Sequence, residues 1–190
     1  MCNERVLCAG FGGQGVMSLG QLLAYAGMIE NRHVTWMPSY GPEMRGGTAY
    51  CSVMVSDNPV GSPIATSGAT CAIIMNLPSL LKFESAVVAG GRIFVNSSLI
   101  DRQVRRHDIE AWYIPANELA AQCGNAKAAN MVMLGAYLAV ASPVRTASVV
   151  EAFRKVFGSK GSQLLDLNTR ALHRGAEAAL AGDSHILAAA

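Results

Sequence analysis

The sequence predicts an α/β fold: an open sheet with helices on both faces, a glycine-rich strand–helix turn near the N-terminus, and a helical layer at the C-terminal end. Apolar runs typical of strands alternate with segments of helical spacing through the first half of the chain. Residues 70–75 are almost continuously apolar, as expected for a strand that is covered on both faces. Helical patterns dominate from residue 117 onward, which indicates a layer of helices packed on the sheet.

Strands are expected where short apolar runs meet turn residues. Asp57-Asn58-Pro59 is typical of a turn, and Gly90-Gly91 leads into a further strand. The segment 100–108 is charged, so we expect it to be exposed. The expected strands are residues 5–8, 33–37, 49–55, 70–75, 92–96 and 111–114.

Helices are expected between and after these strands. Pro78 is suited to the first turn of a helix, and Thr146 is a typical N-cap. Gly124, Ser142-Pro143 and Gly158 are expected to end helices. The expected helices are residues 16–29, 78–84, 117–123, 127–141, 146–157 and 162–180, within a single domain of residues 1–181 followed by a flexible tail at 182–190.

The glycine-rich stretch Ala9–Gly15 lies between the first expected strand and the first expected helix. Gly10, Gly12 and Gly15 have the spacing G-x-G-x-x-G. A helix that begins after such a turn directs unpaired N–H groups and the positive end of its dipole at the space above the loop, where phosphate commonly binds. The alternative is that the glycines only allow a close strand–helix junction.

One feature decides between the ligands that this loop could take. A dinucleotide site also needs an acidic residue at the end of the second strand. Here Pro38-Ser39-Tyr40 follows that strand, so the sequence favours phosphate binding and disfavours NAD.

A second loop, residues 38–48, is expected beside the first, because both leave strands at the same edge of the sheet. In it Arg45 precedes Gly46-Gly47, which places a guanidinium group next to open backbone amides and suits a phosphate or carboxylate. The alternative is that Arg45 pairs with Glu43 and braces the loop.

The composition indicates a subunit with large buried interfaces. Hydrophobic residues make up 51% of the chain and charged residues only 15%, against about 25% in an average soluble protein. The apolar stretch Met131–Ala141 is too short to span a bilayer, and we find no signal-peptide pattern. A net charge of +2 does not indicate nucleic-acid binding. We therefore expect protein partners, with a homodimer possible when the chain is expressed alone, and neither a membrane nor a nucleic acid.

The cysteines indicate neither a metal site nor a cluster. None of the five has C-x-x-C spacing, and Cys8, Cys51 and Cys71 lie in strand-like runs typical of a core. Their odd number, with no signal peptide, indicates a reducing cytoplasm. The histidines are scattered, and no acid–base pair or activated nucleophile is evident, so no catalytic residue is predicted.

Residues 10–15, 39–47 and 130–136 form three distinctive runs. Together these runs resemble the gamma subunit of the 2-oxoacid:ferredoxin oxidoreductases, with most similarity to the 2-oxoglutarate and branched-chain (ketoisovalerate) types, followed by the pyruvate and indolepyruvate enzymes. The resemblance implies a complex that decarboxylates a 2-oxoacid oxidatively with coenzyme A, giving acyl-CoA, CO2 and reduced ferredoxin. It implies alpha, beta and delta subunits as partners and ferredoxin as the acceptor. Thiamine diphosphate, Mg²⁺ and 4Fe-4S clusters would lie on those partner subunits.

The resemblance also implies where coenzyme A would lie. The gamma domain lies against the alpha subunit in this family and helps to enclose coenzyme A. The residues that would face coenzyme A are Gly12, Gly13, Gln14, Gly15, Ser39, Tyr40, Arg45, Gly46 and Gly47. Related single-chain pyruvate enzymes carry lysines in the second loop, whereas this chain has Glu43-Met44-Arg45. Apart from the resemblance, the basic run 102–107 could reach a coenzyme A phosphate; the alternative is that it is only a solvated run of charges. A free-standing NAD- or FAD-dependent reductase and a non-catalytic adaptor are the alternatives.

Overall fold

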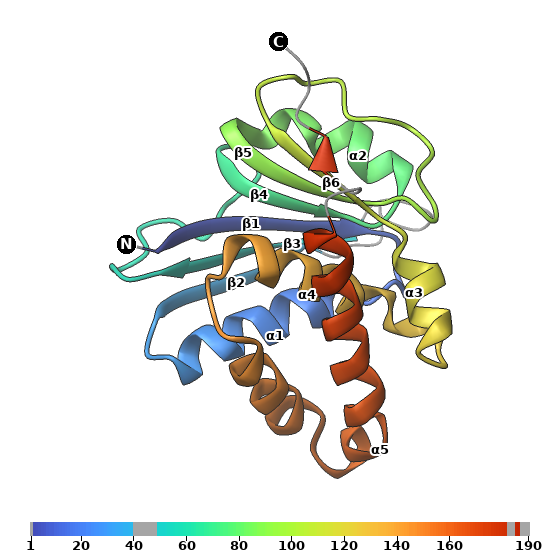
Figure 1. The fold of residues 1–190 in the computed structure, drawn as a ribbon. Helices are drawn as coiled ribbons and strands as arrows, with labels where there is room; N and C mark the ends of the chain where they lie inside the picture. Colours follow the sequence, from blue (N-terminus) through green and yellow to red (C-terminus); the bar gives the residue numbers. More distant parts are fainter. Residues whose placement is uncertain (1, 40–48, 182–184, 187–190) are drawn as a thin grey trace.

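The computed structural model describes residues 2–39, 49–181 and 185–186 (Figure 1). Within them, the strands form a seven-stranded sheet in the order β2-β3-β1-β4-β5-β6-β7. Neighbours β1, β4, β5 and β6 are parallel, and β3 is antiparallel to both β1 and β2. The strands are β1 (Asn3–Gly10), β2 (His33–Ser39), β3 (Ala49–Ser56), β4 (Ala69–Ile74), β5 (Val87–Asn96), β6 (Glu110–Ile114) and β7 (His185–Ile186).

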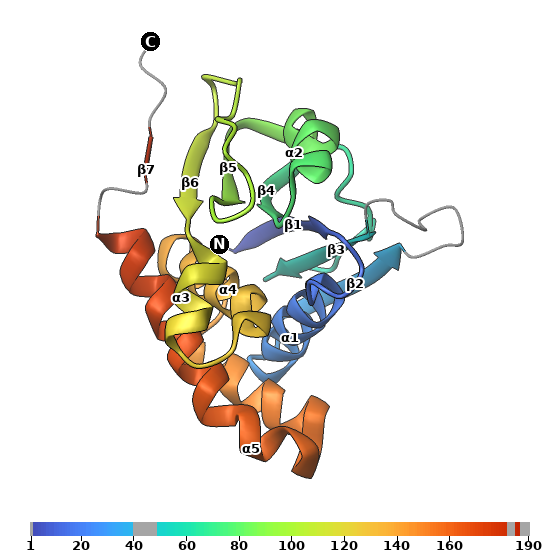
Figure 2. The ribbon, with the colours of Figure 1, turned by 90° about the vertical axis from the view of Figure 1, so that its right-hand side faces the viewer.

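Helices cover both faces of the sheet, as the sequence predicts. One face carries α1, α4 and α5, which is the expected helical layer, and the other carries α2 (Figures 1 and 2). The helices are α1 (Val16–Ile29), α2 (Leu77–Phe83), α3 (Ala116–Gln122), α4 (Ala129–Ala141) and α5 (Thr146–Leu180), with short 3-10 turns η2 (Glu84–Ala86) and η3 (Ala126–Ala128). In α5, Gly158 has non-helical dihedral angles (φ 54°, ψ −145°), so two helical arms meet there, as expected from the sequence.

Several boundaries differ from the sequence-based expectation. β2 continues through Pro38 and Ser39, which is tolerated because β2 lies at the edge of the sheet and loses no ladder bond on its open side. The expected helix 127–141 is divided into η3 and α4. In the stretch expected to be a tail, His185 and Ile186 pair with Trp112 and Ala111 as β7, while 182–184 and 187–190 lie outside the described residues.

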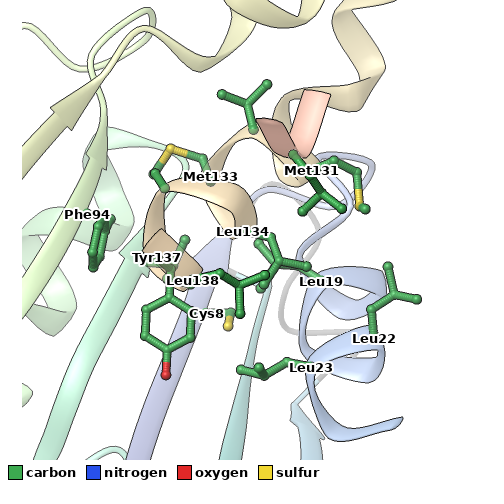
Figure 3. Packing of buried hydrophobic residues seen from close by; sticks show 14 of the residues in the cluster. Cys8, Leu19, Leu22, Leu23, Phe94, Met131, Met133, Leu134, Tyr137 and Leu138 are labelled. Carbon is green, nitrogen blue, oxygen red and sulfur yellow. The ribbon is translucent and has the colours of Figure 1, made fainter. Parts of the chain in front are cut away.

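The larger part of the core lies between the sheet and the layer of α1 and α4 (Figure 3). Leu19 and Leu23 of α1 and Leu134 and Tyr137 of α4 pack toward Cys8 of β1. The other two predicted core cysteines, 51 and 71, are also fully buried, which confirms that prediction. Burial raises the pKa of the Tyr137 hydroxyl well above its usual value, so this side chain stays neutral between α4 and the sheet.

Two glycines bring α4 and α5 into backbone contact. A Cβ atom added at Gly135 would overlap the carbonyl group of Leu172, and one added at Gly175 would overlap the carbonyl group of Val132. Each helix therefore presents a glycine where the other presents its backbone. This close approach fixes how the helical layer lies across the sheet.

Glu30 ties the end of α1 to the start of α5. Its carboxylate oxygen Oε1 accepts hydrogen bonds from the backbone N–H of Arg145 (2.7 Å) and from the hydroxyl of Ser148 (2.6 Å). Arg145 Nε is 3.3 Å from the same oxygen. A carboxylate at this position satisfies donors at the beginning of α5, where the helix has no capping side chain of its own at the N-cap.

These contacts make part of the stability depend on pH. Burial alone would raise the pKa of Glu30, but the hydrogen bonds from Ser148 and Arg145, together with the Arg145 charge, outweigh it and lower the pKa. The stabilisation is thus present above the unfolded pKa of about 4.3 and is lost as pH falls through the lower folded value. We expect Glu30→Gln to cost about 1 kcal/mol at pH 7, the difference between charged and neutral hydrogen bonds.

Urea unfolding of the wild type and the Glu30→Gln variant from pH 7 down to pH 3 measures this effect. The gap in unfolding free energy is expected to narrow at the acid end. Glu177→Gln is the matched control, because Glu177 pairs with Arg174 at an exposed site and its loss should cost less than ~0.5 kcal/mol. A gap that stays constant with pH would mean that the Glu30 charge contributes nothing.

Candidate functional site

The glycine loop turns the chain from β1 into α1 at the carboxyl edge of the parallel strands. The backbone N–H of Gln14 donates to the carbonyl oxygen of Phe11 (3.2 Å) and closes the turn. Gly13 (φ 91°) and Gly15 (φ 75°) adopt the left-handed conformation that favours glycine. The backbone path of the loop therefore favours glycine at these two positions.

The four glycines of the loop have different surroundings. A Cβ atom at Gly10 would come within 2.8 Å of Met75 and Val16, and one at Gly15 within 2.5 Å of Asn130. A Cβ atom at Gly12 or Gly13 would meet none of the described residues within 4 Å. Gly10 and Gly15 therefore serve the close strand–helix junction, whereas Gly12 and Gly13 leave the outer backbone of the loop open.

Gln14 holds the loop to the end of β4. Its side-chain oxygen accepts from the backbone N–H of Phe11 (2.6 Å), and its side-chain nitrogen donates to the carbonyl oxygen of Met75 (3.2 Å). The side-chain nitrogen of Asn76 donates to the side-chain oxygen of Gln14 (3.4 Å). Asn76 also caps α2, because its side-chain oxygen accepts from the backbone N–H of Ser79 (2.9 Å). The side chain of Gln14 is thus engaged within the loop, although its backbone remains part of the open turn.

Asn130 ties α4 to the loop, and the sequence analysis did not assign it to the site. Its side-chain nitrogen donates to the carbonyl oxygen of Gly15 (3.2 Å), while its oxygen accepts from the backbone N–H of Met131 (3.0 Å). The residue is only 8% exposed. Its membership of the run 130–136 was the only signal in the sequence that pointed to it.

The first turn of α1 opens into a cavity. Gly15 is the N-cap and offers no capping side chain, so the first N–H groups of the helix have no partner within it. A cavity of about 410 Å³ lies directly beside them. It is lined by Phe11, Gly12, Gly13, Val16, Ser18 and Ala49. Free amides and the positive end of the helix dipole suit this cavity to an anionic group.

The second loop meets the glycine loop through its two ends. Ser39 pairs with Tyr50, and Tyr50 pairs in turn with Ala9; Ala49 pairs with Gly10. The ends of the loop therefore lie at the same sheet edge as the glycine loop, which confirms that they are neighbours. The predicted site residues Tyr40, Arg45, Gly46 and Gly47 lie outside the described residues.

The basic run 102–107 belongs to another part of the molecule. Arg106 binds Asp108 and the backbone carbonyls of Glu84 and Val87, at the start of β5. The Glu84 carboxylate accepts from the backbone N–H of Arg105 (2.5 Å) and of Arg106 (2.9 Å). Asp108 raises the pKa of Arg106 still further. These contacts lie at the amino edge of the sheet, opposite the glycine loop, so the run braces its own segment.

No three His, Cys, Asp or Glu side chains among the described residues gather where they could hold a metal ion. In the same part of the chain, no helix is both long enough and apolar enough to cross a membrane.

Fold and site together define an α/β domain that presents a glycine loop and a helix N-terminus at the carboxyl edge of its sheet. Residues 5–178 match the protein family described as pyruvate ferredoxin/flavodoxin oxidoreductase. The chain belongs to that family, as the resemblance in the sequence implied.

Two subunits of known oxidoreductase and synthase complexes are similar to this chain. Subunit VorA of the ketoisovalerate oxidoreductase of Methanothermobacter thermautotrophicus is 42% identical over 174 residues, which are 91% of this chain and 36% of VorA. Subunit KorC of the 2-oxoglutarate synthase of Methanothermobacter marburgensis is 30% identical over 159 residues, 80% of this chain and 85% of KorC. This chain thus spans about a third of the length of VorA and corresponds to most of KorC.

Solved structures share the fold over almost the whole chain. The gamma subunit of a keto/oxoacid ferredoxin oxidoreductase from Geobacter sulfurreducens is 25% identical, with a TM-score of 0.80, over 94% of this chain and 99% of that one. The 2-oxoglutarate:ferredoxin oxidoreductase of Magnetococcus marinus is 21% identical, with a TM-score of 0.84, over 97% of this chain and 32% of that one. The similarity to the Magnetococcus enzyme shows a shared fold.

Proposed function

We propose that this chain is the gamma-type subunit of a 2-oxoacid:ferredoxin oxidoreductase and helps to enclose coenzyme A. The complex would decarboxylate a 2-oxoacid oxidatively, forming acyl-CoA and CO2 and reducing ferredoxin. Relatives of the ketoisovalerate and 2-oxoglutarate types support a branched-chain 2-oxoacid or 2-oxoglutarate as the substrate. All the relatives named above are subunits or enzymes of 2-oxoacid oxidation, which does not favour a free-standing NAD or FAD reductase.

The observation that carries this proposal is the open N-terminus of α1 beside the 410 Å³ cavity. Coenzyme A bears several phosphates, and backbone N–H groups at a helix N-terminus are suited to bind them. The Magnetococcus enzyme, which shares the fold, was solved with 2-oxoglutarate, coenzyme A and succinyl-CoA bound. In this chain the open backbone at Gly12 and Gly13 would let a phosphate approach closely.

The chain's own part in the reaction would be binding and positioning. Thiamine diphosphate, Mg²⁺ and 4Fe-4S clusters would be held by alpha, beta and delta subunits, which supply the carbon and electron chemistry. The glycine loop would hold the phosphates of coenzyme A so that its thiol reaches the neighbouring subunit. Gln14 and Asn130 would keep this loop in place through their bonds to Met75 and Gly15.

Gly12→Val separates binding from folding. The described residues leave room for a side chain at Gly12, and its φ is not in the left-handed region, so we expect a melting temperature close to that of the wild type. The new methyl groups would stand in the 410 Å³ cavity and block the approach of a phosphate. In the complex assembled with its partners, we expect the KM for coenzyme A to rise about ten-fold, equivalent to about 1.4 kcal/mol.

The KM for the 2-oxoacid is expected to stay unchanged, because that substrate would bind on other subunits. Gly61→Val is the matched control: Gly61 is also surrounded by open space, but it lies in the turn after β3. An assembled Gly12→Val complex with an unchanged coenzyme A response would overturn the proposal that this loop binds coenzyme A.

A further inference from the structure

Cys8 of β1 and Cys51 of β3 lie directly opposite each other in the antiparallel part of the sheet. Both side chains are fully buried and both thiols are free. Directly opposite residues share one face of a sheet, so both sulfurs point toward α1, on the face where Figure 3 shows Cys8. Cys51 Sγ donates to the carbonyl oxygen of Val16 (3.6 Å), and a Cβ atom at Gly20 would lie 2.4 Å from the same sulfur. The two thiols are thus enclosed between the sheet and the first turns of α1.

The two sulfurs are close enough to react with each other. Opposite Cα atoms in antiparallel strands are about 4.5–5.5 Å apart, which lies within the range of about 4.4–6.8 Å that disulfides span. The sulfurs are already in hydrogen-bond contact, with the Cys8 thiol donating to Cys51. A bond between them therefore needs only a small movement of the side chains and leaves the strands in place.

The two thiols differ in reactivity because their pKa values shift in opposite directions. The hydrogen bond from Cys8 lowers the pKa of the Cys51 thiol, although burial opposes this shift. The same hydrogen bond and burial raise the pKa of Cys8 well above its usual value. Cys51 is therefore the sulfur that reaches the nucleophilic thiolate form, while Cys8 holds its proton. Cys71 of β4 is equally buried, but burial raises its pKa and its partner on β1 is Val6 rather than a cysteine.

A small oxidant can approach this pair from the glycine loop. The 410 Å³ cavity is lined by Val16, whose carbonyl group Cys51 contacts, and by Ala49, two residues before Cys51. Hydrogen peroxide is little larger than water, so a slight opening between β3 and α1 is enough to admit it.

We propose that Cys8 and Cys51 are a redox-active pair, which hydrogen peroxide closes into a disulfide between β1 and β3. The Cys51 thiolate attacks one peroxide oxygen and breaks the O–O bond, which gives a sulfenic acid and, after protonation of the leaving hydroxide, one water. The Cys8 sulfur then attacks the Cys51 sulfur, and the hydroxyl group leaves with the Cys8 proton as a second water. The two thiols thus lose two electrons, which reduce one peroxide to two waters, and a thiol reductant reverses the reaction.

The disulfide would act where the two loops meet the sheet. It would join β1, which leads into the glycine loop, to β3, which leaves the second loop, and it would remove the S–H group that Cys51 donates to Val16. The pair is independent of the proposed function, because it involves only thiols of this chain.

Peptide mapping of the full wild-type chain tests this proposal. The folded protein is treated with hydrogen peroxide, the remaining thiols are alkylated in denaturant, and the chain is cut with trypsin and Asp-N. The three buried cysteines then fall in separate peptides, 6–32, 46–56 and 57–82. We expect peptides 6–32 and 46–56 to be joined, with a mass two hydrogens below their sum, and dithiothreitol to separate them.

Three variants, each checked by a melting curve in the reduced state, assign the roles. Cys71→Ala is the matched control, because Cys71 is equally buried but lies outside the pair, and the joined peptides should form to the same extent. Cys8→Ser keeps a donor to Cys51 but has no sulfur, so the Cys51 sulfenic acid should persist and react with dimedone. We expect at least about ten-fold more of this labelling than at Cys8 in Cys51→Ser, because one unit of pKa changes the thiolate fraction ten-fold.

Two results would overturn the proposal. One is that the thiols of Cys8 and Cys51 remain free after the half-buried Cys2 and Cys123 have been oxidised. The other is that peptide 57–82, rather than 46–56, is joined to 6–32. Equal dimedone labelling of Cys8→Ser and Cys51→Ser would overturn the assignment of Cys51 as the attacking sulfur.

Discussion

Gly135→Ala is expected to destabilise the fold by about 3 kcal/mol, the upper part of the usual range for overpacking a core. The added methyl group would overlap the backbone carbonyl of Leu172, and backbone cannot move aside as a flexible side chain can. At an exposed helical site the same change would stabilise the helix by about 1 kcal/mol. The overlap therefore makes the net change in stability unfavourable, because α4 and α5 must move apart to relieve it.

Gly175→Ala tests the same contact from the other helix, since its methyl group would overlap the carbonyl of Val132. Urea unfolding measures both changes, and Gly61→Ala, in open space, serves as a neutral control. Adding Leu172→Ala to Gly135→Ala should not restore stability, because the clash is with backbone. Near-wild-type unfolding of Gly135→Ala would show that the two helices do not pack this closely.

Much of the sheet was predictable because its strands are short apolar runs between turn residues. The misplaced boundaries have local physical causes. Gly90-Gly91 was expected to lead into a strand at residues 92–96, yet β5 already begins at Val87 and runs through both glycines. Gly90 has φ 73°, and the register with β4 shifts between Ala69 and Cys71. A glycine in the left-handed conformation lets the strand bend without ending. Likewise, a proline would interrupt a central strand, but Pro38 is tolerated in β2 because β2 lies at the edge of the sheet.

The site was only partly predictable because its supports come from distant parts of the chain. The spacing of the glycines located the turn, and the expected helix N-terminus follows it. The partners of this turn could not be found from spacing: Gln14 bonds to Met75, 61 residues away, and Asn130 to Gly15, 115 residues away. Nor did the sequence indicate that Lys127 would lie beside the same loop. These juxtapositions depend on how α4 packs on the sheet.

The second large effect is expected at the junction of the glycine loop with α4. In Gly15→Ala, the alanine must adopt φ 75°, which costs about 1–2 kcal/mol for an L-residue. Its Cβ atom would also lie 2.5 Å from the side-chain nitrogen of Asn130, at a cost of about 1–2 kcal/mol more. We therefore expect a loss of about 3 kcal/mol in the free energy of unfolding.

A double-mutant cycle with Asn130→Ala separates these two costs. The single change Asn130→Ala leaves the Gly15 carbonyl without its side-chain donor and should cost about 1–2 kcal/mol. In the double variant, the amide that clashes is gone and only the Cβ atom of residue 130 remains near, at 3.2 Å. The double variant should thus be more stable than the sum of the single changes implies, by about 1 kcal/mol or more. Additivity within about 0.5 kcal/mol, measured by urea unfolding of all four proteins, would contradict the contact between Gly15 and Asn130.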